Sequence, residues 1–182
     1  MTRSKGFFAQ LLVAILLSLT FIGLGDWQLN RAHDVKQVNQ KLPDSPRTNL
    51  EDIASANSNL EPDAINRLVS TSGKYVKTFS APGQKLLGSK SSAVTDLEIR
   101  LLELSGNRGI LVVRGVQSLE SQEIIGQVKI NGRLYPRQTS DAAKAGKDEL
   151  SRIDPALVVA DTKLSLFDGY IIATSEKTKL GE

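Results

Sequence analysis

The hydrophobic pattern begins with one long apolar run. Residues 7–25 contain no charge and a single amide, Gln10. As a helix this run would span roughly 28 Å, about the thickness of a hydrocarbon core. Arg3 and Lys5 precede it without an acid, which favours a cytoplasmic N-terminus. We therefore predict a cytoplasmic tail over 1–6, a transmembrane helix over 7–25 in the lipid bilayer of the cell membrane, and an extracytoplasmic main domain.

A cleaved signal peptide is the alternative interpretation of this run. The apolar part of a signal peptide is usually about 7–15 residues long, shorter than the run found here. The run ends on Ile22-Gly23-Leu24-Gly25, which is a weak cleavage site. A soluble buried helix is also disfavoured, because the segment is apolar on every face. We favour a retained anchor.

A polar stretch, residues 26–66, follows the apolar run. Asp26 to Leu42 has a helical pattern and is expected to extend the membrane helix into water until Pro43. Residues 43–66 are rich in Asp, Asn, Ser and Pro, which is typical of a linker. One helical turn is expected near residues 50–54.

Short apolar or alternating runs begin at residue 67 and predict strands. The predicted strands are residues 69–77, 110–116, 124–135 and 169–174, while 97–104 fits a strand or a short helix. The turn Gly106-Asn107-Arg108-Gly109 would join 97–104 to 110–116 as a hairpin. Since no helix long enough for a parallel crossover separates the strands, we expect an α+β, mostly antiparallel β fold. It would form a sheet or partly closed barrel over 67–175, before a polar tail over 176–182.

Charge and composition exclude several classes of function. The net charge is +3, but Arg3 and Lys5 lie before the apolar run, so the remainder holds 21 basic against 20 acidic residues. Such a near-neutral domain lacks the basic face needed to bind nucleic acid. With no cysteine, one histidine and no phosphate loop, zinc-ligand spacing or nucleophile elbow, we predict that the protein is not an enzyme. An exported hydrolase stays open only because Ser and Lys are plentiful.

Candidate binding residues follow the apolar run. Trp27, Gln28 and Arg31 share one helix face with Leu24. Trp27 and Arg31 could be an aromatic belt anchor with a snorkelling arginine, or the anchors of a docking face for a partner. His33 could ligate haem iron, although a lone histidine in a polar helix is more often solvated.

A single charge interrupts the apolar strand at 110–116. Arg114 would need a partner if it were buried, so we expect it on the exposed face or near the strand end, where it is a further candidate for binding a partner. Tyr75 and Tyr170 are interpreted as core or sheet-surface aromatics. No metal site is predicted.

The segment Gly25-x-Trp27-Gln28-Leu29-x-Arg31 at the end of an apolar helix resembles the opening signature of the Surfeit locus protein one family. Other family motifs follow in order, and Val116 stands where the family usually has Trp. They are Val69-Ser70-x-x-Gly73-x-Tyr75, Leu111-Val112-Val113-Arg114-Gly115-Val116, Gly132-Arg133-Leu134, Arg152-Ile153-Asp154 and Gly169-Tyr170-Ile171, the last two similar to actinobacterial-type members.

The resemblance implies a factor that assists assembly of haem-copper cytochrome c oxidase by binding, with the large oxidase subunit or other assembly factors as partners and a link to haem insertion. Family members usually carry a second, C-terminal membrane helix with a histidine proposed to contact haem. This sequence stops at Glu182 without that helix, and His33 does not match the histidine's position. Haem therefore enters as a cofactor through the resemblance alone. A membrane-tethered envelope adaptor unrelated to oxidase assembly is the alternative function.

Overall fold

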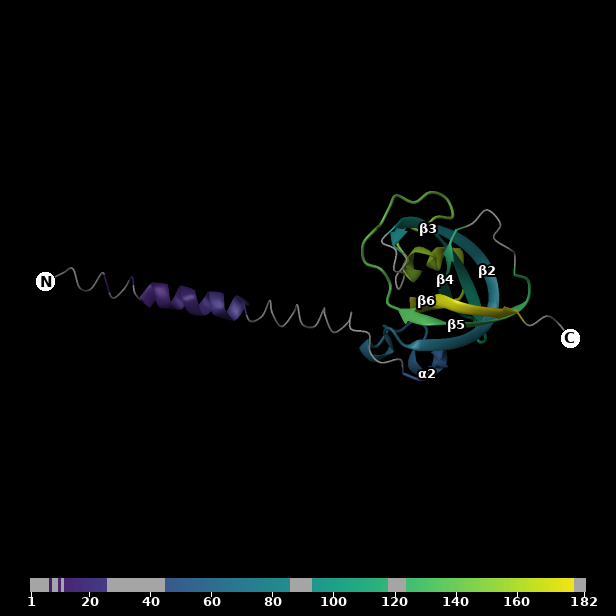
Figure 1. The fold of residues 1–182 in the computed structure, drawn as a ribbon, viewed down its shortest axis with the longest axis horizontal. Coiled ribbons are helices and arrows are strands. Elements are labelled where there is room, and N and C mark those ends of the chain that lie inside the picture. The colour runs from purple at the N-terminus through teal and green to yellow at the C-terminus, as the bar shows by residue number, and fades with distance from the viewer. Residues whose placement is uncertain are drawn as a thin grey trace. The chain divides into compact units, whose positions relative to one another are not determined.

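The computed structural model in Figure 1 describes part of the chain: residues 7, 10, 12–25, 45–85, 93–117 and 124–178. The chain divides into two compact units, one over residues 1–41 and one over residues 42–182. In the first unit, residues 12–25 are helical, and their large apolar side chains are 51–73% exposed. Among the described residues, however, no helix reaches both the length and the apolar character of a membrane span. The helical extension expected over 26–42 lies outside the described residues.

The second unit is built mainly from six strands. Their bounds are β1 (Thr48–Asn49), β2 (Leu68–Lys85), β3 (Val94–Leu104), β4 (Arg108–Val116), β5 (Gln127–Tyr135) and β6 (Ser165–Thr178). The short α-helix α2 (Leu50–Ile53) and the 3₁₀ helices η1 (Pro62–Ala64), η2 (Pro155–Leu157) and η3 (Val159–Asp161) lie between them. The predicted strands, the hairpin of β3 and β4 and the helical turn near residue 50 are therefore confirmed.

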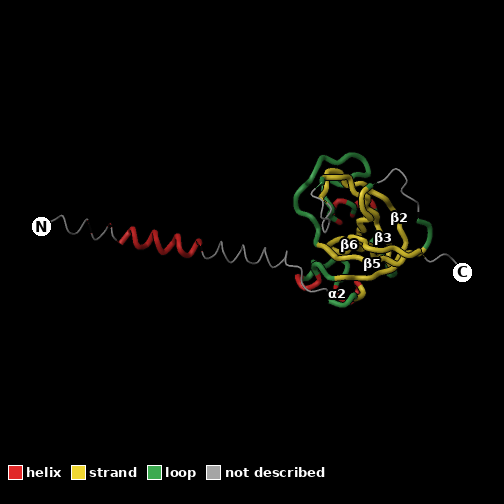
Figure 2. Tube along the Cα trace, in the orientation of Figure 1, coloured by secondary structure: helices red, strands yellow, loops and turns green. Residues whose placement is uncertain are grey.

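The long strand β2 closes the sheet into a barrel. Its first part, residues 68–74, pairs with β5, and residues 74–85 pair with β3. Because the remaining neighbours are β3–β4, β4–β6 and β6–β5, the strands form a closed ring of five, with β1 paired outside it. Figure 2 shows these strands curving around a common centre, with a long loop along the outside.

The length expected for one strand was wrong. Strand β2 continues well past residue 77, because register shifts at Tyr75/Lys77 and Ala81/Gln84 absorb irregular residues and let the strand bend. The sheet is mostly antiparallel, as expected, but it is mixed, because β1 is parallel to β2 and β4 is parallel to β6. Because β5 comes between β4 and β6 in the chain and runs antiparallel to β6, it brings the chain back to the end of the barrel at which β6 starts, and no crossover helix is needed.

Two hydrophobic clusters lie on opposite faces of β3 and β4. The barrel core includes Leu102 and Val112, while the outer core includes Leu101 and Leu111. Burial on both faces explains why residues 97–104 show no strict alternation. Leu50 and Ala64, from the stretch expected to be a linker, are buried in the barrel core.

A loop over residues 136–164 covers the outer core with Leu150, Ile153 and Val158. The buried Gln84 accepts a bond from Gln138 Nε2 at 3.1 Å, and Gln138 Oε1 accepts one from the Ile153 amide at 2.6 Å. These bonds satisfy the polar groups beneath the loop and fix it against the sheet.

Candidate functional site: an ion cluster at one end of the barrel

Charged side chains replace apolar ones at one end of the barrel interior. Side chains alternate between the faces of a strand, so Glu98 and Arg100 lie on the same face of β3 as Leu102 of the barrel core. On β4, Arg114 likewise follows Val112. The barrel interior is therefore apolar along most of its length and ionic at this end.

A β-bulge places Arg114. Glu98 pairs with Gly115 and Ile99 pairs with Val113, which leaves Arg114 as an extra residue on β4. Gly115 has a φ of 134°, a conformation that side chains with a Cβ rarely adopt. Such bulges bend a strand and redirect a side chain, here into the barrel.

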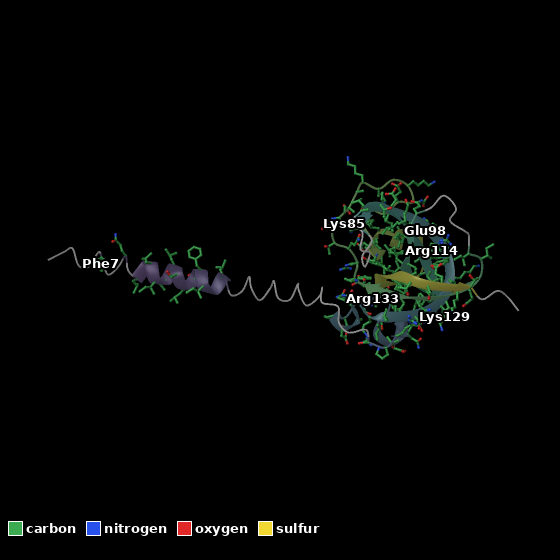
Figure 3. The ribbon with its side chains drawn as sticks, in the orientation of Figure 1. Phe7, Lys85, Glu98, Arg114, Lys129 and Arg133 are labelled. Carbon is green, nitrogen blue, oxygen red and sulfur yellow. The ribbon has the colours of Figure 1, made fainter. Side chains whose placement is uncertain are left out.

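Arg114 joins two acids from different strands. Its Nη1 lies 2.8 Å from Glu98 Oε1, and its Nη2 and Nε lie 2.9 Å and 3.0 Å from Glu176 Oε2 and Oε1. The pairing with Glu176 is bidentate, the stronger and more directional form of an arginine–carboxylate contact. Glu98 also accepts from Arg100 Nε at 2.6 Å. Figure 3 shows Glu98 and Arg114 next to each other.

Tyr75 completes the ion cluster, which consists of Tyr75, Glu98, Arg100, Arg114 and Glu176. Its hydroxyl donates to Glu176 Oε1 at 2.7 Å, and the guanidinium carbons of Arg100 and Arg114 lie 5.3 Å and 5.9 Å from its ring centroid. Burial, and then the bond to Glu176, raise the pKa of Tyr75 far above its usual value. Burial alone would lower the pKa of Arg114, but its bonds and charge interactions with both acids raise it.

The ion cluster links strands where the main-chain ladder stops. The pairing of β4 with β6 ends at Val113 and Ile172. Beyond that point, the side chains of Arg114 and Glu176 join the two strands. The two positive and two negative charges of the cluster are in mutual contact, so none of them is a free nucleophile or a free base. The arrangement is suited to holding the strands of the barrel together.

The structure locates only one of the predicted partner-binding residues, because Trp27, Gln28, Arg31 and His33 lie outside the described part of the chain. Arg114 lies near its strand end, which is one of the two places expected for it. Its side chain is 18% exposed and points at two acids. Binding of a partner by Arg114 stays a prediction.

Sequence reasoning missed four members of the ion cluster as site residues, Tyr75, Glu98, Arg100 and Glu176. One signal was available for two of them. Glu98 and Arg100 stand at alternate positions that continue into Leu102 and Leu104. Charges on what becomes an apolar strand face indicate a buried ionic site, provided that the segment is known to be a strand.

The described residues do not fit haem as a cofactor. They contain no histidine, methionine or cysteine, and they hold no cluster of three or more His, Cys, Asp or Glu suited to a metal ion. Tyrosine ligates haem iron as the phenolate. Burial raises the pKa of all three tyrosines, Tyr75, Tyr135 and Tyr170, which disfavours that form.

Stability is expected to fall steeply in alkali because of Tyr170. Burial, followed by the nearby Tyr135, raises the pKa of Tyr170 from 10.0 to about 12. Between these values the unfolded chain releases a proton that the folded chain keeps, so the free energy of unfolding decreases as pH rises. Urea unfolding at stepped pH measures the slope. Tyr170→Phe should flatten it by about one proton, and an unchanged slope would contradict the assignment.

A model of the SURF1 family matches residues 15–180, a range that includes residues 15–25 of the apolar helix and all six strands. The chain belongs to the SURF1 family. The family resemblance predicted from the ordered motifs is thereby confirmed. A search of curated proteins found no match. The SURF1 family is generally associated with cytochrome oxidase assembly, its members are assembly factors rather than enzymes, and they are typically associated with membranes.

Proposed function

We propose that this SURF1-family protein is a membrane-anchored assembly factor for haem-copper cytochrome c oxidase. It binds the immature oxidase on the extracytoplasmic side and aids haem insertion without catalysing a reaction. The observation that carries the proposal is the family match over residues 15–180. The match includes most of the N-terminal helix and the whole barrel, so both parts belong to the proposed function.

Exposure of the N-terminal helix supports the proposed anchor. Every large apolar side chain between residues 12 and 25 is at least half exposed within its unit. Water penalises such exposure at roughly 25 cal/mol per Å², whereas lipid does not. Arg3 and Lys5 before the helix support a cytoplasmic N-terminus.

The proposed binding function is consistent with the ion cluster. All four of its charged groups have partners within 3.0 Å, so none is available as a nucleophile or a general base. Removing one partner of such a buried ion pair is strongly destabilising, which fits a structural role for the cluster. The barrel is therefore proposed to be a rigid body that presents its outer surface to the oxidase or to other assembly factors.

We further propose that Trp27, Gln28 and Arg31 form the docking face for the large oxidase subunit. Replacing Trp27 and Arg31 together by alanine is expected to lower the oxidase haem signal of membranes at least about tenfold, because the two interface anchors together contribute more than the roughly 1.4 kcal/mol that a tenfold loss of affinity requires. Difference spectra and oxidase activity measure the effect, with immunoblots showing equal amounts of the factor. If membranes with the double variant contained oxidase at the wild-type level, the proposal that these residues form the docking face would be wrong.

The function itself is tested by deletion. A reduced-minus-oxidised spectrum of membranes from a strain lacking the protein should show less oxidase haem, and residues 1–182 supplied in trans should restore it. If the haem signal and oxidase activity never fall, the assembly function is wrong.

A membrane-tethered envelope adaptor is the second candidate function. Val116, which stands where the family usually has Trp, is 58% exposed, so this part of the surface differs chemically from that of typical members. Cross-linking in intact cells separates the two functions. Recovery of oxidase subunits alone would exclude the adaptor.

A further inference from the structure

Three lysines gather on one outward-facing surface of the barrel, and the acid in cross-strand register with one of them is Glu103, opposite Lys74. We define the lysine face as Lys74 on β2, Lys129 on β5 and Lys177 on β6, all exposed. Ser72, Lys129 and Lys177 lie side by side across the three strands, and Lys74 lies opposite Gln127. The buried neighbours Val128 and Ile130 face the barrel core, so the lysines point outward. Figure 3 shows Lys129 at the surface of the barrel.

The arrangement of these lysines opposes stability. Lys129 and Lys177 are direct cross-strand partners, and like charges in this position destabilise a sheet. Within the described part of the chain, none of the three lysines has an acid within ion-pair distance. Glu51 pairs with Arg108 at 2.7 Å, and Glu103 is the cross-strand partner of Lys74 but forms no ion pair with it. Concentrated positive charge that costs stability indicates an anionic ligand.

A polar hollow adjoins Lys129. On one side of β2, β1 pairs with residues 69–70 and β3 pairs from residue 74 onward, and the hollow lies in the gap between these two neighbours. Its walls carry hydroxyls, an amide and one acid. The lining residues are Asn49, Glu51, Ser70, Thr71, Ser72, Ser105 and Lys129. Hydroxyls and an ammonium group suit phosphate oxygens, and the amide suits a ligand hydroxyl.

Apolar side chains flank the lysine face at one end. Val76 follows Lys74 on β2 and is 46% exposed, and Ile125 precedes β5 and is 78% exposed. Lysines beside exposed aliphatic side chains are typical of surfaces that lie in a membrane interface, where the apolar groups enter the boundary and the cations meet headgroups.

We propose that the lysine face and its hollow bind the headgroups of anionic phospholipids, with a hydroxyl-bearing phosphodiester seated beside Lys129. This inference rests on the proposed membrane anchoring, which would keep the barrel close to the bilayer. The barrel thereby has a second contact with the membrane, formed by its folded surface and independent of the N-terminal helix.

The test uses the full chain in nanodiscs of phosphatidylcholine, or of equal parts phosphatidylcholine and phosphatidylglycerol. Lysine acylation is followed by mass spectrometry. Labelling of the lysine face should be on the order of fivefold slower in the anionic discs, the effect of one surface lysine meeting an anionic membrane, and added salt should remove the difference. Lys144, exposed on the loop that covers the outer core, serves as the internal control and should label equally.

Lys129→Glu provides the matched variant. It turns a repulsive cross-strand pair into an attractive one, so the urea midpoint should rise and a folding defect cannot explain lost lipid binding. The difference in labelling at Lys74 and Lys177 should disappear in this variant and persist in Lys144→Glu.

Three outcomes would overturn the inference. Equal labelling in both kinds of disc would overturn this inference and leave the proposed anchoring intact. Slower labelling caused by free glycerol phosphate in neutral discs would identify a soluble ligand in place of lipid. If the chain does not remain with the discs, the proposed anchoring fails, and this inference fails with it.

Discussion

Replacing Gly132 by alanine is expected to unfold much of the barrel. Gly132 lies on β5 opposite Ala173 of β6 and Val69 of β2, at the point where three strands meet. A Cβ built there would overlap the Ile171 side chain and the Ile172 carbonyl oxygen. Since a carbonyl in a strand ladder cannot turn away, we expect a loss of about 3 kcal/mol or more in the free energy of unfolding. Urea unfolding followed by far-ultraviolet circular dichroism measures it.

Gly146→Ala is the matched control. In that exposed loop the nearest atom to a new Cβ is a flexible carboxylate oxygen of Glu149, at 3.1 Å. The expected change is within about 0.5 kcal/mol. If the two substitutions changed the free energy of unfolding equally, the close approach of the strands at Gly132 would not be important for the stability of the barrel.

Arg114→Ala is expected to cost about 3 kcal/mol of unfolding free energy. The substitution removes the cation that contacts both Glu98 and Glu176, and removing one partner of a buried ion pair leaves uncompensated charge in the protein. Adding Glu176→Ala to Arg114→Ala should cost less than Glu176→Ala does alone, because the two residues share one interaction. A double-mutant cycle in urea measures this coupling.

Arg108→Ala is the control that distinguishes the loss of a buried ion pair from the loss of an exposed one. Arg108 also pairs with an acid, Glu51, at 2.7 Å, but their side chains are 32% and 40% exposed. Surface pairs of this kind contribute at most about 1 kcal/mol. If Arg108→Ala and Arg114→Ala proved equally destabilising, the ion cluster would have no special role in closing the barrel.

Local signals predicted the local structure well. The turn residues Gly106 and Asn107 have φ values of 73° and 58°, the left-handed conformations that their residue types favour, and β3 and β4 form the expected hairpin. Leu50 illustrates the limit of this reasoning, because a polar neighbourhood suggested a linker while tertiary contacts bury that one side chain completely.

Pairing partners could not be predicted from periodicity. The parallel contact of β4 with β6 depends on where β5 lies, and no residue of either strand encodes that. The length of β2 was hidden by Pro82 and Gly83, which end most strands but here lie in a bulge. Similarly, the partners of Arg114 are 16 and 62 residues away in the sequence, so a lone charge in an apolar strand revealed only that some partner was needed.

The position of β6 in the ring constrains when the protein can fold during synthesis. β6 pairs with both β4 and β5, so the ring cannot be complete until residue 178 has left the ribosome. By then the apolar helix at residues 12–25 has been outside the ribosome for most of translation. An unfinished barrel exposes unpaired strand edges, which are prone to aggregate. The order of synthesis therefore separates the two parts, because the N-terminal helix emerges early and the barrel can close only after β6 has emerged.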